Sequence, residues 1–233
     1  MRIASLCSGG KDSTYALWLA MLQGHEVKHL IAMIPMRGDS WMFHRPNVHL
    51  IDLFAECVGI PAIKAETTGE KEHELEDLKK VLQTLDVQAV VSGTISSIYQ
   101  KDRIDRICRE LRLSHIAPIW SRDPMEVLGE MVNSCFEAII TSVSAEGLDE
   151  SWLGRKIDRK CLEDLHKVSI KFGVNPAGEG GEYESLVLDA PFFRKRIEIL
   201  KAEPVWKGDR GYLLIKRARS VCKHKREEAC ARL

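Results

Sequence analysis

Ser8-Gly9-Gly10-Lys11-Asp12-Ser13 is a glycine-rich stretch that separates a short apolar segment, residues 2–7, from an apolar segment at helical spacing, residues 14–22. The first segment predicts a buried strand and the second predicts a helix. A glycine-rich turn from strand to helix directs main-chain N–H groups and the positive end of the helix dipole to one point, where phosphate or pyrophosphate binds. The glycines allow close approach of the main chain, the lysine adds a positive charge, and the two serines add hydroxyl donors.

The spacing of this loop distinguishes it from two common phosphate-binding patterns. The Walker loop needs four residues between its first glycine and Gly-Lys-Ser/Thr, and the dinucleotide loop needs G-x-G-x-x-G. The loop of residues 8–13 matches neither. The alternative is a Gly-Gly turn with incidental polar residues, but the flanking strand and helix favour a binding loop.

Composition excludes several classes of protein. The chain has 233 residues, 45% of them hydrophobic and 29% charged, with a formal net charge of +0. A neutral chain has no global field that favours nucleic acid, and no apolar run approaches the ~20 residues of a membrane span. The seven cysteines form no C-x-x-C pair, which argues against a zinc ribbon or an iron–sulfur site. We expect a cytoplasmic protein with no signal peptide, no membrane contact and no direct nucleic-acid partner.

Strands and helices alternate over the first 120 residues. Strands are predicted near residues 2–7, 27–34, 60–64, 88–93 and 115–120, with helices between them. This alternation predicts an α/β fold with a doubly wound parallel sheet, in which ligands bind beyond the carboxyl ends of the strands. We therefore expect the loops after these strands to share one edge of the sheet.

The pattern changes after Trp120. Asp123 and Pro124 predict a capped helix start, and strands are predicted at 137–143, 183–189, 196–202 and 212–217. The sequence therefore predicts a nucleotide-binding domain over residues 1–120 and a smaller α+β substrate domain over residues 121–233.

The segment from Ser92 to Arg103 follows a predicted strand and leads into a helix. One interpretation is a capped helix start, with Ser96 or Ser97 as the cap. The other is a second phosphate or ribose contact that includes Gly93, with Gln100 and Arg103 one turn into the helix. Its proximity to the first loop favours the second interpretation.

A second unusual cluster is Gly178-Glu179-Gly180-Gly181-Glu182-Tyr183-Glu184-Ser185. Glycine and glutamate loops are often only solvated surface. Here Glu182 and Glu184 are two apart, so on a strand they would face the same way. A paired acidic surface suits Mg²⁺, a cationic substrate or proton abstraction.

The loop of residues 37–47 carries Trp41, Phe43 and His44 at the same predicted edge. Exposed aromatic side chains on a loop often bind a ligand. They would equally serve to cover a domain junction.

These four segments together resemble one family. The chain is similar to the diphthine–ammonia ligases of the N-type ATP pyrophosphatases in the loop 8–13, in Trp41-Met42-Phe43-His44, in Ser92–Arg103 and in Glu179-Gly180-Gly181-Glu182-Tyr183-Glu184. The resemblance runs over about residues 1–192 and also includes Gly147–Arg155.

The resemblance implies ATP-dependent amidation of diphthine, a modified histidine on elongation factor 2. A carboxylate is a poor electrophile, so ATP would activate it as an acyl-adenylate with release of pyrophosphate. Ammonia would then displace AMP. The implied substrates and cofactors are ATP, Mg²⁺, ammonia or ammonium and diphthine-modified elongation factor 2, while the oligomeric state stays open.

The resemblance and the residue chemistry together assign roles. Lys11 would offset charge between the α- and β-phosphates and Asp12 would bind Mg²⁺, while Glu182 and Glu184 would attract the cationic groups, and one of them would act as base. The expected ATP-binding residues are Ser8, Gly9, Gly10, Lys11, Asp12, Ser13, Met33, Gly93, Gln100 and Arg103. The expected substrate-binding residues are Trp41, Phe43, His44, Tyr99, Glu179, Gly180, Gly181 and Tyr183, where the aromatic rings would form a cation–π wall for trimethylammonium.

Two other functions fit the same fold. A tRNA-modifying enzyme with the same loop would use paired cysteines or a basic surface, and only Arg103, Arg106, Arg109 and Arg112 suggest a basic stripe. A non-catalytic ATP-binding module would have little need of the Gly/Glu cluster.

Overall fold

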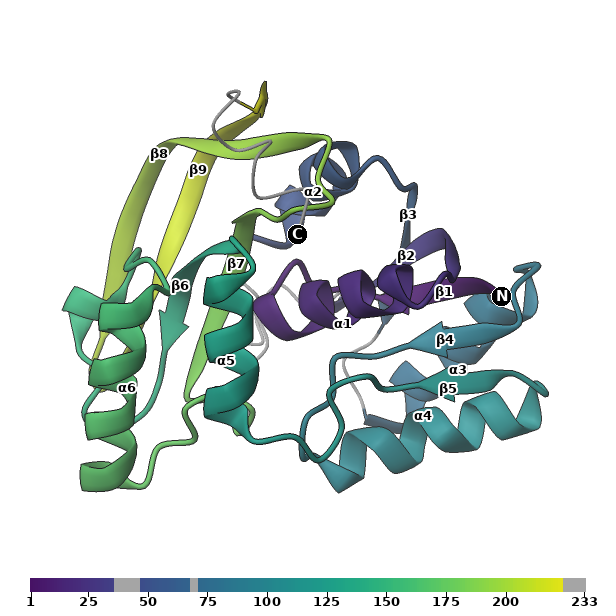
Figure 1. Cartoon of the computed structure of the whole chain (residues 1–233), viewed down its shortest axis with the longest axis horizontal. Helices are drawn as coiled ribbons and strands as arrows, with labels where there is room; N and C mark the ends of the chain where they lie inside the picture. The colour runs from purple at the N-terminus through teal and green to yellow at the C-terminus, as the bar shows by residue number, and fades with distance from the viewer. Residues whose placement is uncertain (36–46, 68–70, 224–233) are drawn as a thin grey trace. The chain divides into compact units, whose positions relative to one another are not determined.

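The computed structural model describes residues 1–35, 47–67 and 71–223, and its parts are drawn in Figure 1. Contacts between residues group the chain into two units. The N-terminal unit comprises Met1–Ser8, Asp12–Ala55 and Ile60–Trp120, and the C-terminal unit comprises Gly9–Lys11, Glu56–Gly59 and Ser121–Leu233. Each unit is described separately below.

The N-terminal unit is built on a five-stranded parallel sheet. Its strands are β1 (Arg2–Leu6), β2 (Glu26–Pro35), β3 (Ala62–Thr67), β4 (Ala89–Val91) and β5 (Ser114–Ile116), in the order β3-β2-β1-β4-β5. The chain winds outward from β1 through β2 to β3 and then returns to the other side of β1. This order confirms the predicted doubly wound α/β fold, and it places the topological switch point between β1 and β4.

Helices cover both faces of this sheet. They are α1 (Lys11–Leu22), a 3-10 turn η1 (Val48–Leu50) continued by α2 (Ile51–Val58), α3 (Lys71–Gln83) and α4 (Ile98–Glu110), with α4 beside β5 (Figure 1). Successive strand residues point to opposite faces, so Ile3 and Val91 join the core cluster that contains α1. Their neighbours Ala4 and Val90 join the cluster that contains α3 and α4. Strands buried on both faces explain the continuous apolar runs in the sequence.

The C-terminal unit contains an antiparallel sheet and two helices. Its elements are α5 (Pro124–Asn133), β6 (Glu137–Val143), η2 (Glu150–Trp152), α6 (Arg159–Phe172), β7 (Tyr183–Asp189), β8 (Lys195–Lys207) and β9 (Arg210–Cys222). The strand order is β7-β6-β9-β8, so β7 lies at one edge of the sheet. Helices α5 and α6 pack side by side (Figure 1). Asp123 caps α5 and Pro124 occupies its first turn, as the sequence predicts.

Three element boundaries differ from the sequence prediction. Strand β5 ends at Ile116, two residues before Pro118, which has no N–H to donate to the sheet. The hairpin of β8 and β9 is longer than predicted, since its pairing runs from Lys195 opposite Cys222 to Lys207 opposite Arg210. Helix α1 begins at Lys11, three residues earlier than predicted, and this difference shapes the site described below.

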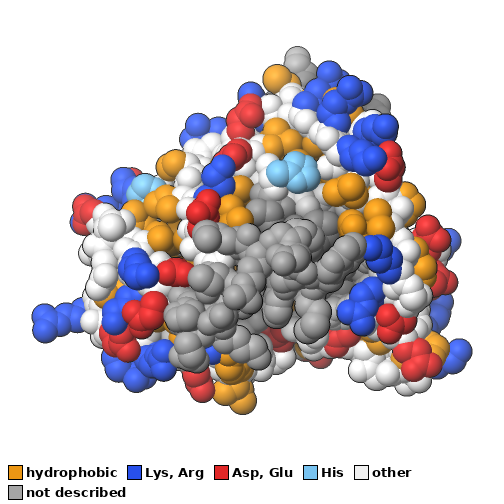
Figure 2. All heavy atoms as spheres, turned by 180° about the vertical axis from the view of Figure 1, so that it is seen from behind, with side chains coloured by type: hydrophobic (Ala, Val, Ile, Leu, Met, Phe, Trp, Pro, Cys, Tyr) orange, Lys and Arg blue, Asp and Glu red, His pale blue; other side chains and the backbone are white. Residues whose placement is uncertain are grey.

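The surface carries charges of both signs. Figure 2 shows lysine, arginine, aspartate and glutamate side chains interspersed over the face in view, in keeping with the formal net charge of +0. Within the described ranges, no helix is both long enough and apolar enough to cross a membrane.

Candidate active site

The glycine-rich loop lies at the carboxyl end of β1, and its second half is already helical. Because α1 begins at Lys11, the N–H groups of Lys11, Asp12 and Ser13 belong to the first helical turn, where they have no partner in the preceding turn of the helix. Gly9 has a φ of +75°, which residues with a Cβ adopt rarely. This strand-to-helix geometry is the one that the sequence predicts, and a helix start of this kind favours an anion.

The two serines of the loop contact each other. The main-chain N–H of Ser8 donates to Oγ of Ser13 at 3.3 Å, and the two hydroxyl oxygens are 3.2 Å apart. The pair therefore closes the loop across its base. Ser8 is exposed, so its hydroxyl is accessible to a ligand.

The loop after β4 packs directly against this loop at the switch point. A Cβ added to Gly93 would lie 2.5 Å from both the carbonyl carbon of Asp12 and the amide nitrogen of Ser13. Only a residue without a side chain allows the two main chains to approach so closely. The parallel sheet therefore brings two sequence-predicted segments together within the N-terminal unit.

Residues 9–11 group with the C-terminal unit through hydrogen bonds to the edge strand β7. The N–H of Val187 donates to the carbonyl oxygen of Gly9 at 2.9 Å. The N–H of Lys11 donates to Oγ of Ser185 at 3.1 Å. These bonds join the glycine-rich loop to the edge strand of the antiparallel sheet, and Ser185 accepts one of the N–H groups at the start of α1.

The Lys11 side chain is 2% exposed and contacts the segment that precedes β7. Its ammonium donates to the carbonyl oxygen of Ala177 and lies 4.8 Å from the centre of the Tyr183 ring. The hydroxyl of Tyr183 donates in turn to the carbonyl oxygen of Pro176 at 2.7 Å. Lys11 therefore fixes one end of the Gly/Glu cluster, and the aromatic ring predicted for a substrate cation contacts a cation of the chain itself.

Glu182 turns its carboxylate onto its own loop. Its Oε1 accepts the N–H of Asn175 at 3.1 Å, and both carboxylate oxygens lie beside Gly180. Its Oε2 is buried and has no hydrogen-bond partner among the described residues. A buried carboxylate oxygen in this position is an acceptor that suits a donor such as ammonium.

The other predicted residues occupy more varied positions. Glu184 is exposed on β7, so its carboxylate is more accessible than that of Glu182. Glu179 and Gly181 lie in the turn before it, where the carbonyl oxygen of Gly181 accepts the hydroxyl of Ser144 at 2.6 Å. Gly10 is in the loop, and Met33 lies near the carboxyl end of β2, beside β1.

The first turn of α4 is a capped helix start. The hydroxyl of Ser97 accepts the N–H of Gln100 at 3.4 Å, so Ser97 is the cap that one interpretation predicts. Tyr99 is 52% exposed and its ring lies 4.7 Å from the Arg103 guanidinium, which also donates to its hydroxyl. Trp41, Phe43 and His44 lie outside the described residues.

Sequence reasoning missed several residues of this region. Ser185 and Val187 bind the glycine-rich loop, and Ala177 binds Lys11. Ser185 is the last residue of the Gly/Glu cluster, but no role was predicted for it from the sequence. Val187 and Ala177 make their contacts through main-chain atoms, which every residue type possesses, so the sequence carries no indication of these two contacts.

The fold and the loop together define a class: an α/β protein with a glycine-rich loop at the switch point of a doubly wound parallel sheet. Comparison with known families narrows this class. The family model for the diphthamide synthase N-terminal domain matches residues 1–115, and that for the C-terminal domain matches residues 123–221. The chain belongs to the diphthamide synthase family.

Curated relatives carry one name. A protein of Bos taurus named diphthine–ammonia ligase is 35% identical over 88% of this chain and 85% of its own length. The Homo sapiens protein of the same name is 34% identical with the same coverage of both chains. The Schizosaccharomyces pombe protein is 34% identical over 93% of this chain, which spans only 39% of that longer relative.

One solved structure is more distantly similar. It is described as a predicted subunit of tRNA methyltransferase from Methanocaldococcus jannaschii, and it is 17% identical with a TM-score of 0.41. The match covers 82% of this chain and 99% of that chain. A likeness at this level carries no inference about function.

Proposed function

We propose that the protein is a diphthine–ammonia ligase, which amidates the diphthine carboxylate of elongation factor 2 with ammonia at the expense of ATP. Curated relatives of that name, 34–35% identical over most of the chain, carry this proposal. The glycine-rich loop at the switch point supports the use of a phosphate-bearing substrate. The tRNA-modifying enzyme and the non-catalytic module are not favoured.

The first step would activate the carboxylate. A carboxylate oxygen attacks the α-phosphorus of ATP, the bond between the α-phosphorus and the bridging oxygen breaks, and pyrophosphate leaves. The main-chain N–H groups at the start of α1 and the hydroxyls of Ser8 and Ser13 would bind the departing phosphates. Lys11, at the same helix start, would offset the charge that develops between the α- and β-phosphates.

ATP would bind at the start of α1, beside the point where the loop after β4 packs against the glycine-rich loop. Gly9 would allow close approach of the nucleotide, Gly93 would keep the two loops in contact, and Met33, Gln100 and Arg103 would complete the contacts to ATP. Mg²⁺ would be held by the Asp12 carboxylate together with oxygens of the ATP phosphates. No group of three His, Cys, Asp or Glu side chains in the described ranges suits a metal on its own, so phosphate oxygens would complete the hard oxygen shell that Mg²⁺ requires.

The second step would transfer the acyl group to nitrogen. Ammonia attacks the acyl carbon, the bond from that carbon to the AMP oxygen breaks, and the nitrogen loses a proton. The buried Oε2 of Glu182 would receive an N–H donor, and Glu182 or Glu184 would take the proton. Glu179, Gly180, Gly181, Tyr99 and Tyr183, with Trp41, Phe43 and His44 outside the described residues, stay the proposed contacts to the protein substrate. In this reading residues 1–120 bind the nucleotide and residues 121–233 serve the protein substrate.

The decisive experiment is ATP turnover with ammonium, with and without diphthine-bearing elongation factor 2. The products are separated as AMP and pyrophosphate or as ADP and phosphate. Formation of AMP and pyrophosphate that depends on the factor, together with diphthamide detected by mass spectrometry, is the expected result. AMP formation independent of the factor would point to another carboxylate, and ADP with phosphate would contradict the proposal.

A further inference from the structure

A chain of polar side chains lies behind the loop after β4, and the proposed mechanism does not use it. The hydroxyl oxygen of Ser92 lies 2.8 Å from Nε2 of His115, and Nδ1 of the same ring lies 2.6 Å from Oδ1 of Asp105. On the far side, the Asp105 carboxylate accepts the ammonium of Lys101 at 2.5 Å. All four residues belong to the N-terminal unit.

The sheet and one helix hold this chain in place. His115 lies on β5 opposite Val90 of β4, and the N–H of Ser92 donates to the carbonyl oxygen of Ile116 at 3.0 Å. Asp105 and Lys101 lie one turn apart on α4. The His115 side chain is 5% exposed, so water has little access to the ring.

The burial of Ser92 excludes a simple nucleophilic triad. Serine, histidine and aspartate in this order are the arrangement that activates a serine nucleophile. Ser92, however, is 3% exposed, and its other neighbour at 3.2 Å is the hydroxyl of Thr94, which is also buried. The chain instead links α4 to the loop that carries Gly93.

The Asp105 carboxylate decides which way the hydrogen bonds run. Burial raises the pKa of this carboxyl, but hydrogen bonds from Lys101 and His115 lower it by more in sum, so the group is held below its ordinary value. An ionised carboxylate only accepts, so Nδ1 of His115 carries the hydrogen, and in the neutral ring Nε2 is then the acceptor. Ser92 therefore donates to His115, and Thr94 donates to Ser92.

We propose that His115 and Asp105 form a positioning pair that fixes the direction of the Ser92 and Thr94 hydroxyls for binding of the nucleotide. Gly93, between these two hydroxyls in the chain, packs against Asp12 and Ser13 of the phosphate loop. Thr94 donates its hydrogen to Ser92, and both residues are buried, so the pair acts on the nucleotide by holding the Gly93 loop against the phosphate loop. That the phosphate loop binds a nucleotide is the part of this inference that rests on the proposed function.

Asp105→Asn is the sharpest variant because it keeps the shape and removes the charge. An amide NH₂ can donate to Nδ1, which would move the ring hydrogen to Nε2. The direction of the hydrogen bonds from His115 through Ser92 to Thr94 would then be reversed. Asp102→Asn is the matched control, since Asp102 is an exposed residue of the same helix. Denaturant unfolding of both variants would establish that they are folded.

The first readout is the tautomer of His115, observed by long-range proton–nitrogen NMR on protein labelled at histidine. The His115 signal is assigned by its loss in His115→Gln, and spectra are recorded at about pH 8, where an ordinary histidine is neutral. We expect hydrogen on Nδ1 in the wild-type protein and in Asp102→Asn, and on Nε2 in Asp105→Asn. Hydrogen on Nε2 in the wild-type protein would overturn the proposal without any variant.

The second readout is ATP affinity by calorimetry, which needs no elongation factor. We expect Asp105→Asn to weaken ATP binding about tenfold, the effect of one hydrogen bond that no longer matches its partner, and Asp102→Asn to leave affinity unchanged. A reversed tautomer with unchanged affinity would overturn the positioning role. Failure of the wild-type protein to bind ATP would count against the proposed function and against the nucleotide part of this inference. The NMR spectrum would still decide the direction of the hydrogen bonds between Asp105, His115, Ser92 and Thr94.

Discussion

The N–H of Lys11, the first residue of α1, donates to the hydroxyl of Ser185 on β7 at 3.1 Å. The two residues are 174 positions apart, so a serine side chain caps a helix that lies far earlier in the sequence. The N–H groups at a helix start are either capped or bound by a ligand. Ser185 therefore contributes to the stability of the loop that we propose to bind ATP.

Replacement of Ser185 by alanine should lower the free energy of unfolding by about 1 kcal/mol, the usual contribution of one hydrogen bond to a helix start. Urea denaturation followed by circular dichroism would measure the change. Ser114→Ala, in an exposed position of β5, is the matched control and should change stability by less than about 0.5 kcal/mol. Equal stability of the two variants would show that the bond from Lys11 contributes nothing.

Gly93→Ala should damage the site, whereas Gly129→Ala should not. The added Cβ at Gly93 would meet two main-chain atoms at 2.5 Å, while at Gly129 in α5 it would meet nothing within 4 Å. We expect Gly93→Ala to cost about 1–3 kcal/mol of stability and to weaken ATP binding. Gly129→Ala should raise stability by about 0.5–1 kcal/mol, because alanine is the better helix residue. Unaltered ATP affinity in Gly93→Ala would remove this loop from the proposed nucleotide site.

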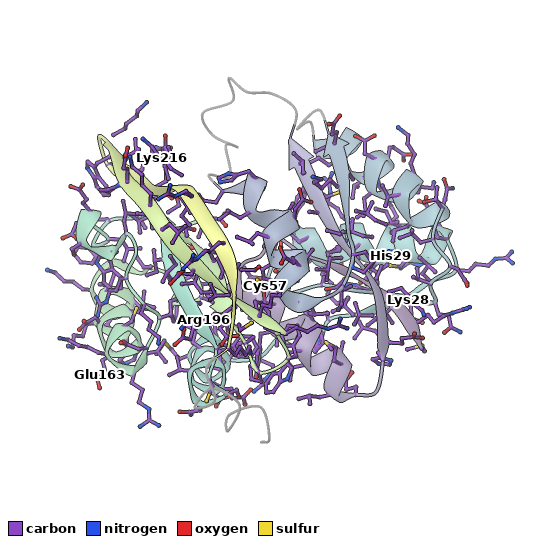
Figure 3. The ribbon with its side chains drawn as sticks, turned by 90° about the horizontal axis from the view of Figure 1, so that it is seen from above. Lys28, His29, Cys57, Glu163, Arg196 and Lys216 are labelled. Carbon is purple, nitrogen blue, oxygen red and sulfur yellow. The ribbon has the colours of Figure 1, made fainter. Side chains whose placement is uncertain are left out.

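Lys11→Met keeps the apolar stem of the side chain and removes its charge. Loss of one preorganised cationic group at developing charge should slow pyrophosphate release about 100-fold. Lys28→Met is the matched control, since Lys28 lies on β2 (Figure 3), where its ammonium pairs with exposed Glu26 at 2.5 Å. A coupled assay for pyrophosphate would compare the two variants, and full-rate release from Lys11→Met would refute the assignment of the loop.

Glu182→Gln tests the acidic residue of the Gly/Glu cluster. The glutamine carbonyl can still accept the N–H of Asn175, so the loop should keep its conformation while the negative charge is lost. We expect the ammonia-dependent formation of diphthamide to fall about 100-fold or more, the range for loss of a general base. Glu163→Gln, at an exposed position of α6 (Figure 3), is the control. Unchanged ammonia-dependent turnover would show that Glu182 has no role in proton transfer.

The parallel sheet could be predicted because its determinants are local. Strands such as residues 89–91 are short apolar runs bounded by turns, and α3 shows its apolar face at helical spacing. The handedness of βαβ units limits the strand orders that such a sheet can adopt, but the observed order was not itself predicted. In the C-terminal unit the periodicities predicted strands and helices, but the length of the β8–β9 hairpin depends on pairing between distant residues, for which a single sequence has no local pattern.

The site could be predicted only in part for the same reason. The loop 8–13 and the Gly/Glu cluster are unusual in composition and were therefore visible. That Lys11 binds Ala177, and that Glu182 folds back onto Asn175, depends on main-chain groups that every residue type possesses. His115 and Asp105 were missed because neither residue stands out in the sequence. Only the fold places the Asp105 carboxylate and the Ser92 hydroxyl at the two nitrogens of the His115 ring.

The bonds from β7 to Gly9 and Lys11 have a practical meaning for anyone who dissects this protein. A fragment that ends at residue 120 would contain the whole glycine-rich loop but neither Ser185 nor Val187, so the carbonyl of Gly9 and the amide of Lys11 would be returned to water. The residues that hold the loop in place therefore come from separate stretches of the sequence. Truncation at residue 120 would separate the glycine-rich loop from the strand β7 that binds it. Residues 1–120 and 121–233 are therefore better studied as a co-expressed pair than as independent fragments.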